Sequence, residues 1–209
     1  MFHRPVRAAL CVAAASILSA ECASAAILTF TDSTLYDTAV AGMGRATETF
    51  DGLVGASGAV LTGAASGSGL TIAWSASSTG GVSVSPFGGS LALTTGSAAA
   101  VTLSNFGVPV MGISGWFYGR NGTVGATSLM LSVILDDGTS AVSLIDATTG
   151  FVGIYSNSAA SVASLTLTPQ SGGGALAPVI DNLNFAVMPA SGAVALLGLA
   201  GLARSRRRG

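Results

Sequence analysis

The chain has 209 residues, of which half are hydrophobic and only 8% are charged, and its formal net charge is −1. It contains no lysine, a single histidine at His3, and two cysteines, Cys11 and Cys22, all close to the N-terminus. The rest of the chain therefore lacks the residues for Ser-His-Asp or Cys-His hydrolysis, for Schiff-base chemistry, and for zinc binding through thiolate or imidazole.

The first 25 residues have the pattern of a secretory signal peptide. Arg4 and Arg7 precede an apolar run over residues 8–20, and small residues follow at 23–25, as a signal peptidase requires. A signal peptidase is therefore an expected partner of the chain. We expect cleavage after Ala25, which removes both cysteines. The mature chain is then expected to fold without disulfides although its destination is oxidising.

The segment from Ala26 to Val187 has the size of one domain with a core of its own. It holds two arginines, Arg45 and Arg120, against eight acidic residues, so its formal net charge is −6. This acidic balance excludes the basic surface that nucleic-acid binding requires. Carboxylate chemistry remains open to the domain, either as glycoside hydrolysis or as binding of a hard cation.

Short runs in which apolar and small polar residues alternate recur through this segment and predict β-strands. Turn-forming glycine, serine, asparagine and aspartate separate them. The runs are Leu70–Trp74, Val82–Val84, Leu91–Thr94, Val101–Leu103, Leu129–Val133, Val142–Leu144, Leu165–Leu167 and Leu183–Phe185. Many short strands in one domain predict an all-β fold, a two-sheet antiparallel β-sandwich of jelly-roll type.

Two local patterns are more specific. Ile134–Thr139 predicts a hairpin in which Asp137 and Gly138 occupy a primed turn. Thr38–Arg45 is the one stretch that suits a helical turn, although its two glycines weaken it. Trp74 lies in a strongly alternating run and is expected in the core.

The C-terminal segment, residues 188–209, combines a proline-containing entry, an uncharged run rich in alanine and leucine, and a basic end. The residues that form the entry and the basic end are Pro189, Ala190, Ser191, Arg204, Arg206, Arg207 and Arg208. The run is a marginal membrane-spanning helix, and its arginines favour the cytoplasmic side of the inner membrane. An ordinary C-terminal anchor that stays in the membrane is one interpretation.

The order of these three parts resembles the PEP-CTERM sorting signal, here in a Pro-Ala-Ser form. The resemblance covers Met188 to Arg208 and implies an exosortase-like membrane protease as partner. It also implies delivery to the surface of a bacterium that produces exopolysaccharide.

Three short motifs, Thr49–Leu53, Gly150–Ile154 and Ile180–Phe185, resemble the framework of secreted jelly-roll domains that precede such tails. That framework is similar to carbohydrate-binding modules, in which a structural calcium ion is familiar.

Glu48, Asp51 and Asp181 are the candidate calcium ligands. The first and last strands of a jelly roll commonly lie side by side, so these carboxylates are expected to converge, with backbone carbonyls completing the shell. The alternative is structural: Asp51 belongs to a turn, and Asp181 caps the entry to a strand.

The densest aromatic and polar cluster is Trp116, Phe117, Tyr118, Arg120 and Asn121. Alternation places Trp116 and Tyr118 on one face of a strand and Phe117 on the other. An exposed Trp116 and Tyr118 beside Arg120 and Asn121 would form a platform for sugar rings. The alternative places Trp116 in the core between the sheets.

The sequence therefore predicts an exported, non-enzymatic protein of the cell surface or the exopolysaccharide matrix. The alternative function is glycan binding. A third hypothesis, glycoside hydrolysis, requires Glu48 and Asp181 to face one cleft.

Overall fold

The computed structural model describes residues 27–120, 128–145, 150–170 and 177–188. The elements in chain order are β1 (Ile27–Phe30), α1 (Ser33–Ala39), β2 (Gly44–Glu48), a 3₁₀ turn η1 (Asp51–Leu53), β3 (Ser57–Gly67), β4 (Leu70–Phe87), β5 (Ser90–Thr95), β6 (Val101–Ser104), β7 (Val110–Arg120), β8 (Leu129–Leu135), β9 (Ser140–Ile145), β10 (Phe151–Ser156), β11 (Val162–Pro169) and β12 (Ala177–Val187). Each predicted run lies within a strand, but Leu70–Trp74 and Val82–Val84 belong to one long strand, β4, and not to two.

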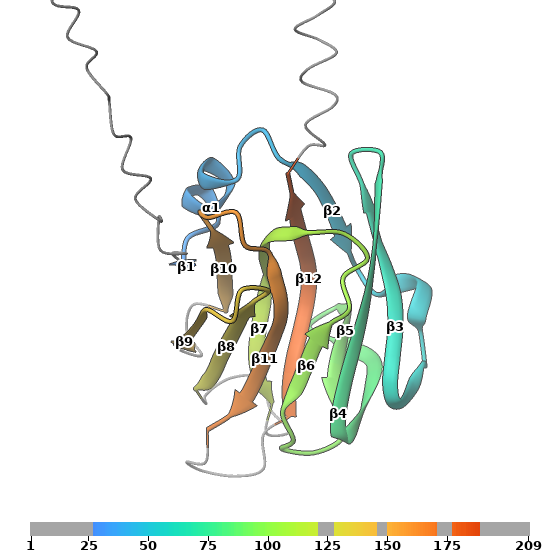
Figure 1. The fold of residues 1–209 in the computed structure, drawn as a ribbon. Helices are drawn as coiled ribbons and strands as arrows, with labels where there is room; N and C mark the ends of the chain where they lie inside the picture. The colour runs from blue at the N-terminus through green and yellow to red at the C-terminus, as the bar shows by residue number, and fades with distance from the viewer. Residues whose placement is uncertain (1–26, 121–127, 146–149, 171–176, 189–209) are drawn as a thin grey trace, which may run out of the picture.

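The strands form two antiparallel layers (Figure 1). One layer, which we call the helix-side sheet, has the order β1-β10-β7-β12-β2, and the far sheet has the order β3-β4-β6-β11-β8-β9; a single pairing of β2 with β3, Thr47 opposite Ser66, makes the strand order continuous. β11 packs against β7 and β12 across the interior. Within these layers, the neighbours β2-β12-β7-β10 and β6-β11-β8-β9 give the jelly-roll arrangement, in which the chain repeatedly crosses from one sheet to the other. The predicted fold class is therefore confirmed.

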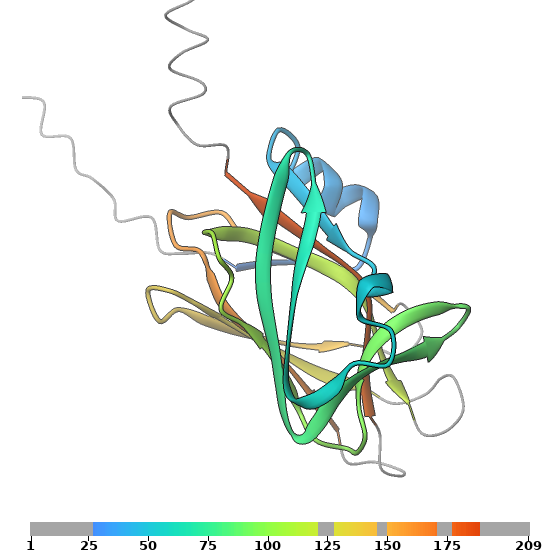
Figure 2. The same ribbon diagram turned by 90° about the vertical axis from the view of Figure 1, so that its right-hand side faces the viewer.

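The two layers are joined along one side. β3 and β4 run together as a long hairpin there (Figure 2). β4 pairs with β6 through Ser75–Ser77 and later with β5 through Val82–Phe87, and β5 in turn pairs with β12. Gly81, with φ of +76°, lies between these two parts of β4. The backbone bonds of the far sheet therefore continue into the helix-side sheet.

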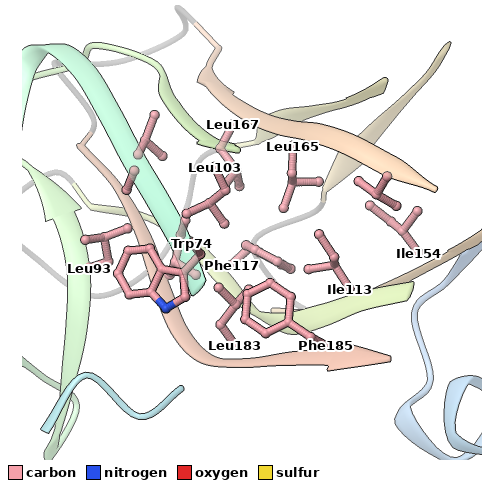
Figure 3. Close-up of a cluster of buried hydrophobic side chains, with 14 of the residues drawn as sticks. Trp74, Leu93, Leu103, Ile113, Phe117, Ile154, Leu165, Leu167, Leu183 and Phe185 are labelled. Carbon is pink, nitrogen blue, oxygen red and sulfur yellow. The ribbon is translucent and has the colours of Figure 1, made fainter. Parts of the chain in front are cut away.

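The core fills the space between the layers, and both sheets contribute to it (Figure 3). Trp74 is 1% exposed, as predicted, and its ring meets that of Phe50 edge to face, with the ring centroids 5.7 Å apart. Leu165 and Leu167 enter the core from β11, opposite Phe117 and Leu183 of the helix-side sheet. Burial of these alternating side chains is the main favourable term for the fold.

The predicted hairpin at 134–139 is confirmed, but its turn type was wrong. The N–H of Gly138 donates to the carbonyl of Leu135 (3.0 Å), and Gly138 has φ of +86°. Asp137 does not have a positive φ, and its Oδ1 instead accepts from the N–H of Thr139 (2.8 Å). The connection is thus a three-residue loop with a left-handed glycine, because the aspartate side chain stabilises a turn that needs only one positive φ.

The helix lies earlier than predicted. Asp32 precedes α1, and its Oδ1 accepts from the N–H groups of Thr34 (2.7 Å) and Leu35 (3.1 Å), so the helix begins at Ser33. β2 already begins at Gly44, within the stretch predicted to be helical. The N-cap decides the position because it satisfies donors that a helix start otherwise leaves unpaired.

In the part of the chain that the structure describes, no helix has the length and apolar character needed to cross a membrane. The predicted signal peptide and nearly all of the C-terminal sorting segment, from residue 189 onward, lie outside the described residues.

Candidate binding face

The outer face of the helix-side sheet carries the predicted aromatic cluster. Trp116 is 40% exposed and Phe117 is 1% exposed, which shows that neighbouring residues of β7 point to opposite sides of the sheet. Tyr118 shares the outer face with Trp116. The alternative of a core Trp116 is therefore wrong. The side chain of Arg120 and all of Asn121 lie outside the described residues.

The aromatic side chains on this face form a row. The rings of Trp116 and Tyr118 are nearly parallel, at 8°, with centroids 6.4 Å apart. Phe151 of β10 meets Trp116 edge to face at 5.9 Å, and Phe87, at the end of β4, lies 5.4 Å from Tyr118. These contacts hold the rings in place without burying Trp116.

Gly150 supports the row from below. A Cβ built at Gly150 would lie 2.8 Å from Cε1 of Tyr118 and 3.1 Å from Cε3 of Trp116. Its φ of +61° is a second reason for glycine at this position. The carbonyl of Gly150 accepts from the N–H of Phe117 at 2.7 Å, which ties this position to β7. A glycine is needed here because the rings lie directly on its backbone.

A groove of about 550 Å³ opens beside Trp116. Its polar lining comes from α1, β2, β7, β12 and the turn between β3 and β4, which are distant in sequence and adjacent in the fold. Its lining includes the side chains of Asp37, Arg45, Thr47, Ser114, Trp116 and Asn184. The volume lies in the range of small-ligand sites.

Hydrogen bonds fix the polar side chains of the groove. Thr47 Oγ1 donates to Asn184 Oδ1 at 2.6 Å, and Asn184 Nδ2 donates to the carbonyl of Asn182 at 2.9 Å. Arg45 pairs with Asp37, and its guanidinium lies 5.9 Å from the ring centroid of Tyr36. The ion pair is partly exposed, so its polar atoms are accessible from the groove. Because its two charges are opposite, the pair adds no net charge to the groove.

The sequence did not indicate Arg45, Thr47 or Asn184 as site residues. Arg45 and Thr47 alternate with the buried Ala46 and Glu48, so the pattern of β2 already placed them on an outer face. What the sequence lacked was the pairing of β2 with β12, which brings Thr47 opposite Asn184. Non-local strand pairing cannot be derived from alternation alone.

Tyr36 of α1 covers the other half of this face. Its ring lies over Gly112 and Gly153, where a Cβ would come within 2.7 Å and 2.4 Å of Tyr36 atoms. Tyr36 is 1% exposed, and its hydroxyl makes no regular hydrogen bond, although Ser114 lies beside it. Burial raises the pKa of Tyr36 well above its ordinary value, and Ser114 and Arg45 oppose that shift.

This burial predicts an alkaline weakness. Because the folded-state pKa of Tyr36 is raised, its contribution to stability is complete below pH of about 10 and is lost as the pH rises further. Tyr36→Phe is expected to leave stability at pH 7 within about 0.5 kcal/mol, since the hydroxyl has no regular partner. Urea denaturation from pH 8 to 11 should show a smaller loss in the variant, and equal slopes would contradict this assignment.

The three predicted calcium ligands do not form one site. Glu48 is 8% exposed and points into the core, where its Oε1 accepts from the N–H of Phe50 (2.8 Å) and its Oε2 from Nε1 of Trp74 (3.0 Å). Asp51 is exposed, and its Oδ2 accepts from Thr49 Oγ1. Across the described ranges, no group of three acidic, histidine or cysteine side chains is placed to hold a metal ion.

Asp181 lies on the opposite side of the sheet from Glu48. A bulge between Asp181 and Asn184 inserts one extra residue into β12, with Asn182 at φ of +49°. Simple alternation from Leu183 would have pointed Asp181 inward, whereas the bulge turns it outward, opposite Trp116. Glu48 and Asp181 therefore face no common cleft, and the carboxylate pair required for glycoside hydrolysis is not assembled.

Comparison with known proteins gives little further information. No family model and no curated protein matches the chain. Two solved structures, both mutants of CBM29-2 described as probing ligand recognition by family 29 carbohydrate-binding modules, are similar at 14% and 13% identity. They cover 64% and 69% of this chain and 87% and 92% of their own chains, with TM-scores of 0.34 and 0.36.

Proposed function

We propose that the β-sandwich is a carbohydrate-binding domain, and that the protein acts as a non-enzymatic glycan binder at the cell surface or in the exopolysaccharide matrix. The observation that carries the proposal is the half-open Trp116, which stands beside a groove lined by Arg45, Thr47 and Asn184. An aromatic ring offers its face to the C–H groups of a pyranose, while the surrounding polar groups exchange hydrogen bonds with the hydroxyls.

A single exposed apolar side chain needs no explanation, so the exposure of Trp116 counts only together with its neighbours. Trp116 is grouped with Tyr118 and stands at the edge of a groove that has a polar lining. Contacts with Tyr118, Phe151 and Gly150 keep the ring of Trp116 in a fixed, partly exposed position. A fixed, exposed aromatic ring favours a role in recognition.

We further propose that the N-terminal 25 residues direct export of the protein and that residues 188–209 direct its sorting to the cell surface. The absence of lysine and of cysteine between Ala26 and Val187 is compatible with an exported domain. Mass spectrometry of the protein from its native cell surface reports both mature ends. An N-terminus at Met1 together with an intact C-terminus would contradict both processing steps.

The binding proposal predicts the effect of Trp116→Ala. The variant should bind at least tenfold more weakly to whichever oligosaccharide the wild type retains on a glycan array, because interface tryptophans commonly dominate binding energy. Val142→Ala is the matched control, since Val142 is 63% exposed on the far sheet. Undiminished binding by Trp116→Ala would exclude the platform.

A further inference from the structure

The floor of the groove beside Trp116 is a row of three polar residues on neighbouring strands. β2, β12 and β7 lie side by side in the helix-side sheet (Figure 1). Their register places Thr47 opposite Asn184, and Asn184 opposite Ser114. All three residues line the groove. A ligand in the groove would therefore rest on hydroxyl and amide groups.

Two different walls flank this row. β2 and β7 both run antiparallel to β12, so they run in the same direction. Arg45 precedes Thr47 by two residues on β2, whereas Trp116 follows Ser114 by two residues on β7, so Arg45 and Trp116 lie on opposite sides of the row. Along the strands their positions are about 13 Å apart, at about 3.3 Å per residue. This separation, in a groove of about 550 Å³, leaves room for a sugar ring between the two walls.

The wall opposite Trp116 is the ion pair of Arg45 with Asp37 of α1. Arg45 Nη2 donates to Asp37 Oδ1, and the two side chains are 39% and 53% exposed, so a ligand can reach both. The guanidinium lies over the buried ring of Tyr36. A carboxylate accepts about four hydrogen bonds and a guanidinium donates five, so this one contact leaves most of the capacity of both groups unused. The pair thus presents an acceptor and a donor next to each other.

Two neighbouring hydroxyls of a sugar, a vicinal diol, match such a pair. Each hydroxyl can donate and accept, so one donates to Asp37 while its neighbour accepts from Arg45. An isolated hydroxyl reaches only one of the two groups. The carboxylate of a uronic acid would compete with Asp37 for Arg45 and would approach the charge of Asp37. It would do so in a segment, residues 26–187, whose formal net charge is −6.

We propose that Arg45 and Asp37 determine the ligand class of the groove, which takes a neutral pyranose that presents a free vicinal diol to the ion pair while its ring contacts Trp116. This inference rests on the proposed glycan-binding function and names the class of glycan. Glycans whose units lack neighbouring free hydroxyls are rejected, and so are glycans built from uronic acids.

Isothermal titration of the full chain with five oligosaccharides tests the ligand class. Cellohexaose, mannohexaose and xylohexaose are neutral, and their internal units have free hydroxyls at both C2 and C3. Chitohexaose is also neutral, but its internal units have an acetamido group at C2 and therefore no vicinal diol. Hexagalacturonate has the diol together with a carboxylate. We expect the best of the three neutral diol sugars to bind at least tenfold more tightly than chitohexaose and hexagalacturonate. Equally tight binding of either would overturn the inference.

Asp37→Asn and Arg45→Lys test the two residues. The first keeps the shape of Asp37 and removes its charge, and the second keeps the charge of Arg45 and removes its planar set of donors. We expect each variant to bind the neutral diol sugar at least tenfold more weakly, and Asp37→Asn also to discriminate less against hexagalacturonate. Both melting temperatures should stay within about 3 °C of the wild type, because an exposed ion pair contributes little to stability. Asp51→Asn, which changes an exposed carboxylate outside the groove, is the matched control and should leave both quantities unchanged.

The outcomes separate this inference from the proposed function. If the ion pair only holds α1 against β2, both variants should melt earlier and bind like the wild type, which would overturn the inference. If Trp116→Ala loses binding while Asp37→Asn and Arg45→Lys retain it, the pair plays no part in recognition and the proposed function stands. A wild type that binds a glycan on the array but none of the three neutral diol sugars would likewise overturn the inference alone. A wild type that binds no glycan at all would overturn both proposals.

Discussion

Glu48→Ala is expected to destabilise the domain by about 2–6 kcal/mol, because a buried donor left without an acceptor costs about 1–3 kcal/mol and Glu48 serves two of them. The variant leaves the N–H of Phe50 and Nε1 of Trp74 without acceptors inside the core. Phe50 is also one of few non-glycine residues with a positive φ, at +62°, and its hydrogen bond to Glu48 helps to hold that conformation. The loss therefore affects both the tryptophan and the start of η1.

Urea denaturation of the full chain measures this effect, and two variants calibrate it. Glu48→Gln retains one acceptor oxygen but turns an N–H₂ group toward a donor, so we expect an intermediate loss. Asp51→Ala removes an exposed carboxylate whose partner is Thr49, and it should change stability by less than about 0.5 kcal/mol. A loss below about 1 kcal/mol for Glu48→Ala would show that the buried hydrogen bonds contribute little.

The contrast between Glu48 and Asp181 shows where sequence reasoning reaches its limit. Alternation correctly predicted the strands, the core position of Trp74 and the opposite facing of Trp116 and Phe117, because period two follows directly from strand geometry. It did not predict the partner of Glu48, since the indole of Trp74 is 26 positions away in the chain. Each carboxylate looked like a free ligand because a side chain that donates to it, Trp74 for Glu48 and Ser90 for Asp181, is distant in the chain.

The bulge in β12 is the second limit. Asn182 enters the left-handed region and shifts the register by one residue, which reverses the facing of Asp181. Asparagine tolerates that conformation better than most residues, but it adopts it in few of its occurrences. A bulge of this kind changes which side chains reach the binding face, and a pattern that assumes regular alternation misses it. The predicted helix began too late in the chain because the prediction overlooked the N-cap at Asp32, which starts α1 at Ser33.

Phe117→Ala is expected to lower the free energy of unfolding far more than Trp116→Ala, although the two residues are neighbours on β7. Phe117 is 1% exposed and contributes to the core between the sheets, so its truncation should cost about 3–5 kcal/mol of unfolding free energy. Trp116 is the larger side chain, yet it is 40% exposed and lies on the outer face of the sheet. Its truncation should cost about 1 kcal/mol, the value of its aromatic contacts with Tyr118 and Phe151.

The two variants should also separate in binding. Trp116→Ala is expected to melt close to the wild type and to lose glycan affinity. Phe117→Ala is expected to melt much earlier, with affinity preserved at temperatures where it stays folded. Thermal melting and titration of the same preparations measure both quantities. If Trp116→Ala unfolded as readily as Phe117→Ala, the indole would be part of the core, and the half-open ring would no longer support a recognition surface.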